Sequence, residues 1–290
     1  MLIDQIKILE ELDDSQRFTL ILEWMKKDGL APEIDKYSTG QNIFLQSPRN
    51  HKIAVASHFD TVPFTPGAND NASAVVVCLE LARRNQKNPL RNIGLEIYIF
   101  DEEEKGLIGS NAYLQKFGIT GLIGLMNMEM VGKGNQFAIW PLNSSAKGKA
   151  LESFEFIAKK KKIPCGRYDR IVMNTADHES FRSHGLEDSF TITCISDEDV
   201  SVAAHYYKAM ALEVDNNTLH KIINRAPIFE HYHQPTDKSD FLSETTLQMT
   251  VDTIWETIVK LRQRIVHLIA TVYPYHDPSP RQVHYMERTL

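Results

Sequence analysis

Short apolar runs rich in β-branched and aromatic residues recur in the first half of this chain and alternate with a helical pattern. The runs cover residues 43–45, 52–57, 93–100 and 121–130. Between the second and the third, residues 71–84 place Ala74, Cys78 and Leu81 on one helical stripe. Strands that are apolar along their whole length are buried on both faces. We therefore predict an α/β fold with three layers, αβα, in which helices cover both faces of a mixed, mostly parallel central sheet.

The same alternation continues along the rest of the chain. Helices are expected at residues 15–27, 146–162 and 177–184, a strand at 189–195, and a polar, helical stretch up to residue 223. From Leu247 onward the apolar residues follow in steps of four and three, which predicts a long helix with one face on the core. Since no repeat or linker interrupts the pattern, residues 1–290 are interpreted as one domain with a tail at about 273–290.

Composition excludes several classes of protein. The chain has 32 Lys and Arg against 38 Asp and Glu, a net charge of −6, so a nucleic-acid binder with a basic surface is not expected. No apolar stretch reaches the ~18 residues of a membrane span, and the N-terminus lacks a signal-peptide pattern. The three cysteines, Cys78, Cys165 and Cys194, support neither a disulfide framework nor a cysteine-based zinc site. A cytoplasmic protein without membrane or nucleic-acid partners is expected.

The most informative polar feature is a run of four carboxylates at the end of a buried strand. The apolar residues 97–100 lead directly into residues 101–104, which read Asp-Glu-Glu-Glu. At a separation of ~4 Å, each pair of like charges costs up to ~4 kcal/mol at an effective dielectric constant of ~20. We therefore expect a cation beside Glu103 and Glu104.

A histidine and two aspartates follow the strand at residues 52–57. Residues two apart in an extended segment point the same way, so His58 and Asp60 share a face, as a metal-binding imidazole and its carboxylate partner do. Asp70 lies in the turn that opens the next helix. Taken singly, a structural histidine–aspartate hydrogen bond and a helix cap would explain these residues better than a metal site.

Glu129 and His233 complete the pattern. Glu129 follows an apolar strand, and buried glutamates are rare unless they are paired or bound to a metal, whereas His233 lies in a proline-bounded loop. The candidate carboxylates are Asp60, Asp70, Glu103, Glu104 and Glu129. They fall at strand ends or in adjoining loops, where open α/β sheets build their sites, and two divalent cations would largely offset their charge. Imidazole and carboxylate ligands without thiolate suit zinc, with cobalt or manganese as alternatives.

Six segments together resemble the co-catalytic zinc exopeptidases, a family that contains bacterial leucine aminopeptidases, glutamate carboxypeptidase II and glutaminyl cyclases. They lie in family order at residues 57–63, 67–74, 103–110, 127–132, 176–181 and 232–237. The resemblance implies that Asp70 bridges two zinc ions. Glu104 and His233 would complete one metal site, and His58 and Glu129 the other.

The resemblance also implies roles for residues that do not bind the metals. Glu103 would be the general base, because adjacent residues point differently and Glu104 is the ligand. Asp60 would orient His58, and Tyr232 would hydrogen-bond the developing oxyanion. Asp177 and His178 would line the wall of the pocket or contact the metal ligands without binding the metals themselves.

The implied activity is hydrolysis of a peptide or amino-acid amide by an aminopeptidase with two zinc ions. Position 129 is Glu where this family usually has Asp, so an N-acyl amino acid deacylase or carboxypeptidase stays an alternative. The residues between Glu129 and His233 already supply core elements, which leaves no room for the lid domain of those enzymes. A glutaminyl cyclase with one zinc and a non-catalytic binding protein are further alternatives. Residues 165–175 and 196–217 are expected to border the specificity pocket, and the sequence indicates no oligomeric state.

Overall fold

The sheet has a parallel centre and antiparallel additions at its edges. The computed structural model describes residues 1–142, 145–168 and 175–272. Within them lie β1 (Glu33–Lys36), β2 (Gln41–Leu45), β3 (Lys52–His58), β4 (Gly94–Phe100), β5 (Leu122–Met128), β6 (Gln136–Trp140), β7 (Cys165–Arg167) and β8 (Ser189–Ile195). These strands form one sheet in the order β1-β2-β4-β3-β5-β8-β6-β7. The four inner strands β4, β3, β5 and β8 are parallel, whereas β2 joins β4 and β6 joins β8 antiparallel.

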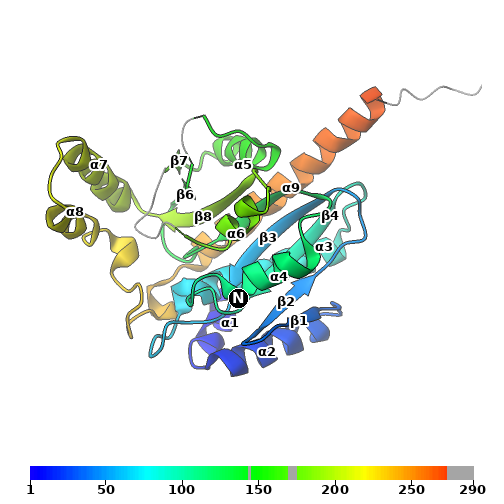
Figure 1. Ribbon diagram of the computed structural model, residues 1–290, viewed down its shortest axis with the longest axis horizontal. Coiled ribbons are helices and arrows are strands. Elements are labelled where there is room, and N and C mark those ends of the chain that lie inside the picture. Colours follow the sequence, from blue (N-terminus) through cyan, green and yellow to red (C-terminus); the bar gives the residue numbers. More distant parts are fainter. Residues whose placement is uncertain (143–144, 169–174, 273–290) are drawn as a thin grey trace, which may run out of the picture.

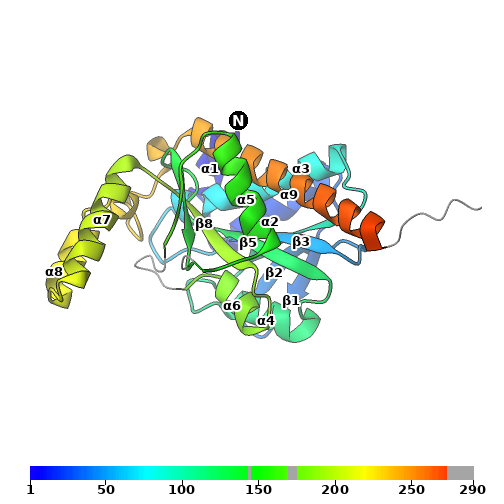
Figure 2. The ribbon, with the colours of Figure 1, turned by 90° about the horizontal axis from the view of Figure 1, so that it is seen from above.

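Helices cover both faces of this sheet, which confirms the predicted three layers (Figure 2). One face carries α1 (Leu2–Leu9), α2 (Asp14–Lys27), α3 (Ser73–Lys87), α5 (Lys149–Lys160) and α9 (Glu244–Val272), which share the larger hydrophobic core. The other face carries α4 (Ile108–Phe117) and α6 (His178–Ser183), which pack on a smaller aromatic core. Burial on both sides explains why β4 consists entirely of buried residues.

The long C-terminal helix α9 docks as its periodicity predicts. Its buried apolar side chains on the core are those of Leu247, Val251, Ile254, Ile258 and Leu261. The side chains of Ile265 and Leu268, which continue the pattern, lie outside the described part of the chain, as does the tail at 273–290. The helix packs against α3 and α5 and covers the larger core on that face of the sheet (Figures 1 and 2).

The polar stretch before residue 223 forms a helical hairpin that projects from one end of the molecule (Figures 1 and 2). It consists of α7 (Asp197–Ala211) and α8 (Asn216–Ile223), which confirms the predicted helical character. Asp199 is the buried residue of α7, and Leu219 is the buried residue of α8. The hairpin therefore adds little to the core of the sheet.

Several short elements are absent from the sequence prediction. They are α1, β1, α4, β6 and β7. β1 has one buried side chain, that of Asp35, so it carries no apolar signal, and β7 is only three residues long. These two strands lie at the edges of the sheet and form because a neighbouring strand offers backbone partners, which a local pattern cannot reveal.

Within the described residues, the helices lack the combination of length and apolar composition needed to cross a lipid bilayer. This finding agrees with the hydropathy of the sequence over the same region.

The packing of α9 makes stability depend on its buried face. Replacement of Ile254, which is fully buried, by alanine is expected to lower the free energy of unfolding by about 2–5 kcal/mol through lost contacts and a cavity. Thr245→Ala, at an exposed position of the same helix, is the matched control and is expected to change it by less than about 0.5 kcal/mol. Urea unfolding measures both values, and equal losses would contradict the docking of this face.

Candidate metal centre

The predicted site residues meet at the carboxyl edge of the parallel strands. His58 is the last residue of β3, Glu103 and Glu104 follow β4 closely, and Glu129 comes directly after β5. β3 lies between β4 and β5 in the sheet, so the ends of all three strands are neighbours. The amide of Glu129 donates to the carbonyl of Ile192 on β8 at 3.0 Å, which extends the pairing to the residue itself. This edge is where open α/β sheets place their ligands.

Asp70 lies between the two histidines. It belongs to the turn Ala68–Ala72 that precedes α3, and Ala72 is the cap of that helix, so Asp70 is not the helix cap. Its Oδ1 is 3.4 Å from Nε2 of His58, and its Oδ2 is 3.3 Å from Nε2 of His233. One carboxylate thus faces two imidazoles, one on each side.

In the part of the chain that the structure describes, three groups of side chains bring potential ligand atoms within 4.8 Å of one another: His58, Asp70 and Glu129; Asp70, Glu104 and His233; and His58, Glu103 and Glu104. The first two groups share Asp70 and coincide with the two sites inferred from the sequence. In the first, Nε2 of His58 lies 3.2 Å from Oε2 of Glu129, and in the second, Nε2 of His233 lies 3.2 Å from Oε2 of Glu104. The five predicted ligands are therefore brought together, and their role as ligands stays a prediction.

The electrostatics of this region favour a bound cation. Burial lowers the pKa of His58, but the carboxylates of Glu129 and Glu103 raise it well above its usual range. Burial also lowers the pKa of His233, and the facing carboxylates of Asp70 and Glu104 raise it to about 9. Oδ2 of Asp70 and Nε2 of His233 are buried, yet neither makes a hydrogen bond of normal geometry with a described residue. Converging lone pairs in a negative environment fit a divalent metal.

Asp60 connects the histidine to both glutamates. Its Oδ1 lies 3.3 Å from Nδ1 of His58, in agreement with the shared face expected from the sequence. The same carboxylate accepts the backbone N–H groups of Glu103 and Glu104, both at 3.1 Å. Asp60 thereby fixes the backbone from which the two glutamate side chains project, a role that the sequence does not indicate.

The two adjacent glutamates face different partners. Glu104 approaches His233, whereas Oε2 of Glu103 is 4.0 Å from Nε2 of His58. Glu103 is 7% exposed, and burial raises its pKa well above the usual range. Asp177, just before α6, is fully buried, and burial raises its pKa to about 8.

Tyr232 and His178 occupy different environments. The ring of Tyr232 stacks on that of His233 with centroids 3.7 Å apart, and burial and nearby carboxylates raise its pKa, so the phenol keeps its proton. Nδ1 of His178 lies 2.7 Å from the hydroxyl of Thr191, and its ring packs edge-on against Trp140. Burial lowers the pKa of His178 to about 3, so this ring is neutral inside the protein.

Asn71 and Asp237 support the site without being predicted. Asn71 donates to Oε2 of Glu129 at 2.6 Å, and Asp237 accepts the N–H groups of Asn69 and Asp70 at 2.9 and 3.0 Å. Asp237 was part of a family-like segment, but its partners lie 167 and 168 residues away in the sequence. No local pattern could therefore assign its role.

Arg17 and Asp14, both in α2, hold the loop between His58 and Asp70. The guanidinium of Arg17 is 1% exposed and donates to the carbonyls of Leu9, Phe59 and Pro66. Asp14 accepts both the N–H and the hydroxyl of Thr61 at 3.1 Å. The sequence predicts a helix at residues 15–27, and the structure shows that the first turn of α2 also positions the site.

The fold has three layers, and at one edge of its sheet imidazoles and carboxylates gather around a shared aspartate. This combination defines a metallohydrolase of the zinc-exopeptidase type. The chain belongs to peptidase family M28, whose family model matches residues 42–258. This membership confirms the family resemblance found in the sequence.

Individual proteins are similar to the chain in sequence or in fold. The chain is 38% identical over 102 residues to aminopeptidase YwaD of Bacillus subtilis, which covers 32% of this chain and 22% of that protein. Its fold resembles that of BSAP, a zinc aminopeptidase from Bacillus subtilis, with a TM-score of 0.59, 24% identity, and coverage of 76% of this chain and 50% of that one. It also resembles the glutaminyl cyclase of Porphyromonas gingivalis, with a TM-score of 0.66, 16% identity, and coverage of 89% and 98%. The chain spans less than half the length of the curated relatives it matches.

Asp237 offers a test of how the metal loop is held. Asp237→Asn is expected to weaken zinc binding about 10–100-fold, because the amides of Asn69 and Asp70 lose a charged acceptor. Asp240→Asn, an exposed carboxylate three residues further on, is the control and should leave zinc affinity unchanged. Competition with a chromophoric chelator measures both affinities. Equal affinity in the two variants would show that Asp237 does not position Asp70.

Proposed function

We propose that this protein is an aminopeptidase that binds two zinc ions and removes N-terminal residues from peptides. The observation that supports the proposal is the pair of ligand groups sharing Asp70, with the carboxylate of Glu103, which belongs to neither of these two groups, close to His58. Membership of peptidase family M28 supports hydrolysis of a peptide bond. The family resemblance supports zinc, and cobalt or manganese would suit the same ligands.

Each ion would have its own ligands and share one. His58 and Glu129 would hold one ion, Glu104 and His233 the other, and Asp70 would bridge them. Two bound divalent cations would supply Lewis acidity to the scissile carbonyl and to the attacking water. Asn71 and Asn127 donate to the two oxygens of Glu129, so its carboxylate is held in one orientation.

Glu103 is the proposed general base. It would take a proton from the attacking water and pass it to the leaving amine, since its backbone is fixed by Asp60 and its side chain reaches the same space as His58. Tyr232 keeps its proton and lies against His233, which suits it to donate a hydrogen bond to the developing oxyanion. The carboxylates around the site would also attract the free α-amino group of a peptide.

A glutaminyl cyclase is the second candidate function. The group of Asp70, Glu104 and His233 can hold a single ion by itself, which is the number that the resemblance associates with those enzymes. His58 lies 3.4 Å from Asp70 and 3.2 Å from Glu129, and this second group of potential ligands favours two ions and therefore the peptidase.

Activity with defined substrates tests the proposal. Metal-free protein refilled with zinc, cobalt or manganese is expected to cleave aminoacyl-p-nitroanilides and to contain two ions per chain by mass spectrometry of the metals. N-acyl amino acids and N-terminal glutaminyl peptides serve as comparison substrates. Turnover of acylated substrates alone would indicate a deacylase, and cyclisation with one ion per chain would indicate a cyclase. Absence of turnover with all three classes of substrate would favour a non-catalytic binding protein.

The adjacent glutamates make a matched pair for the mechanism. Glu103→Gln is expected to lower kcat about 100-fold or more while both ions stay bound, because the base is lost and the ligands are intact. Glu104→Gln is expected to lose an ion as well as activity, because it removes a ligand from one site. Metal content and kcat are measured on the same samples. Full activity of Glu103→Gln would overturn the assignment of the base.

A further inference from the structure

The turn of the β1–β2 hairpin packs against the segment that carries the two adjacent glutamates of the candidate metal centre. We propose that this turn positions the general base: Thr39 holds the side chain of Glu102, and Glu102 holds the backbone that leads into Glu103. Thr39 and Glu102 are then positioning residues, which act through Glu103 and not on the substrate itself. The inference rests on the proposed function, because it needs Glu103 to be the base.

The order of the strands brings the turn to the end of β4. β4 lies between β2 and β3, and β2 runs antiparallel to it, so the start of β2 is next to the residues that follow β4. Asp60, which follows β3, accepts the amides of Glu103 and Glu104 from one side. The hairpin turn contacts the same segment from the other side, so residues 101–104 are held between two parts of the fold.

Backbone and side-chain contacts join the turn to this segment. The amide of Gln41 donates to Oδ2 of Asp101 at 3.0 Å, and the hydroxyl of Thr39 donates to Oε2 of Glu102. A Cβ atom at Gly40 would lie 2.6 Å from Oδ2 of Asp101, which is closer than real Cβ atoms approach. The turn therefore packs so tightly on the segment that a side chain at position 40 has no room.

Glu102 has a backbone conformation that needs support from its surroundings. Its φ is +55°, in the left-handed region that residues other than glycine rarely adopt, and the residue is 4% exposed. The hydroxyl of Thr39 bonds one oxygen of its carboxylate, and Nζ of Lys105 lies 3.0 Å from the other. Conformations of this kind persist where surrounding contacts determine them. These two contacts therefore hold the bend of the chain just before Glu103.

Glu103 depends on this support more than Glu104 does. The carboxylate of Glu103 makes no hydrogen bond with another described residue, and its Oε2 is 4.0 Å from Nε2 of His58. Glu104 faces His233 at 3.2 Å and would also be held by a bound ion. The backbone therefore sets the place of the Glu103 carboxylate. Because a displacement of ~1 Å at a reacting group can lower a rate about 100-fold, the bend before Glu103 should affect kcat.

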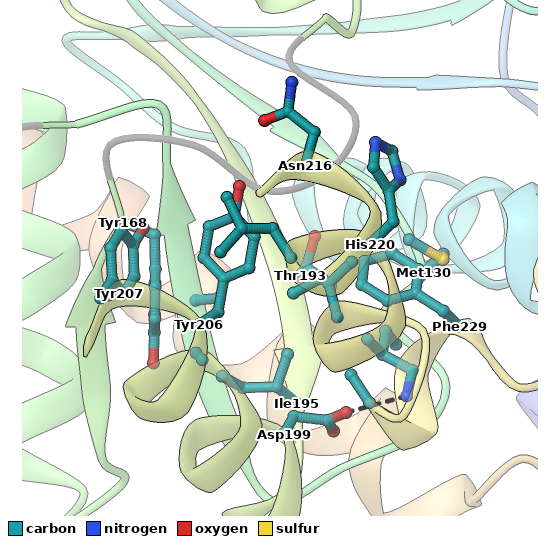
Figure 3. A pocket seen from close by; sticks show the side chains of 16 residues that line it. Met130, Tyr168, Thr193, Ile195, Asp199, Tyr206, Tyr207, Asn216, His220 and Phe229 are labelled. Atoms are coloured by element: carbon teal, nitrogen blue, oxygen red, sulfur yellow. Dashed lines mark hydrogen bonds between the residues drawn. The ribbon is translucent and has the colours of Figure 1, made fainter. Parts of the chain in front are cut away.

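The turn is remote from the cavity of about 210 Å³ that lies between the sheet and the α7–α8 hairpin (Figure 3). Tyr206 and Tyr207 of α7 line that cavity, within the stretch 196–217 expected to border the specificity pocket. Among its described lining residues, none belongs to the β1–β2 hairpin or to residues 101–104. A change at Thr39 therefore leaves the cavity as it is, so its effect should fall on kcat and not on KM.

Thr39 and Ser38 provide matched variants, because both are exposed in the same turn and it is the hydroxyl of Thr39 that bonds Glu102. The substrate is the aminoacyl-p-nitroanilide that zinc-loaded wild-type protein cleaves fastest. Thr39→Ala is expected to lower kcat about 5–10-fold through a small displacement of the base, with KM and metal content unchanged. Thr39→Ser keeps the hydroxyl and should restore kcat, and Ser38→Ala should leave it unchanged.

A double variant shows whether the effect acts through Glu103. In the background of Glu103→Gln, Thr39→Ala is expected to lower kcat no further, because the base is already absent. Glu102→Ala removes both contacts of the carboxylate and should lower kcat at least as much as Thr39→Ala does in the wild-type background. Equal fold losses from Thr39→Ala in the two backgrounds would overturn the positioning role, and so would wild-type kcat in Thr39→Ala.

Hydrogen–deuterium exchange separates this inference from the proposed function. In Thr39→Ala, the amides of Glu103 and Glu104 are expected to exchange about 5-fold faster or more, measured by mass spectrometry on residues 101–107, because the segment opens more often. Ser38→Ala should match the wild type. Unchanged exchange in Thr39→Ala would overturn the inference even if free-amine substrates are cleaved. Absence of turnover by the wild type would overturn the proposed function and the catalytic role of the turn, whereas faster exchange would still show that Thr39 holds the segment.

Discussion

The carboxylates of Asp60, Asp70, Glu103 and Glu129 are no more than 7% exposed, and they lie together at one edge of the sheet. Buried negative charges repel one another and are costly unless cations or hydrogen-bond donors compensate them. Here backbone amides stabilise Asp60, side-chain amides stabilise Glu129, and two imidazoles face Asp70. These donors offset only part of the negative charge. The remaining negative potential raises the pKa values of His58 and His233.

The surrounding fold serves mainly to hold these groups in place. Three parallel strands deliver His58, Glu103 and Glu129 to neighbouring positions, and this arrangement depends on cores that pack both faces of the sheet. The longer connections are fixed separately: Arg17 donates to two carbonyls of the loop after β3 and to one at the end of α1, and Asp237 accepts two amides of the turn that carries Asp70. These hydrogen bonds hold the loops in place, so that the repulsion between the neighbouring carboxylates does not push the loops apart.

The α7–α8 hairpin has a different relation to the core. It contributes few buried residues and stands beside the sheet, so its inward face can vary without disturbing the layers (Figure 1). Asp199 links the start of α7 to Ile228 in the short turn that leads toward His233. The proposed chemistry would therefore depend on the strand ends and the loops that follow them, and not on the core packing of this hairpin.

The sequence by itself determined the layered α/β fold, the long C-terminal helix and the placement of His58, Glu103, Glu104 and Glu129 at the ends of neighbouring strands, whereas Asp70 and His233 were assigned as ligands from the family resemblance. It could do so because strand periodicity is local and the ends of neighbouring parallel strands must meet. Only the tertiary structure decided that Asp60 holds both glutamate amides, that Asp237 and Arg17 fix the turns, and that α7 borders a cavity next to Met130. These contacts join residues far apart in the chain through edge pairing and loop geometry, and no repeating pattern of side chains encodes them.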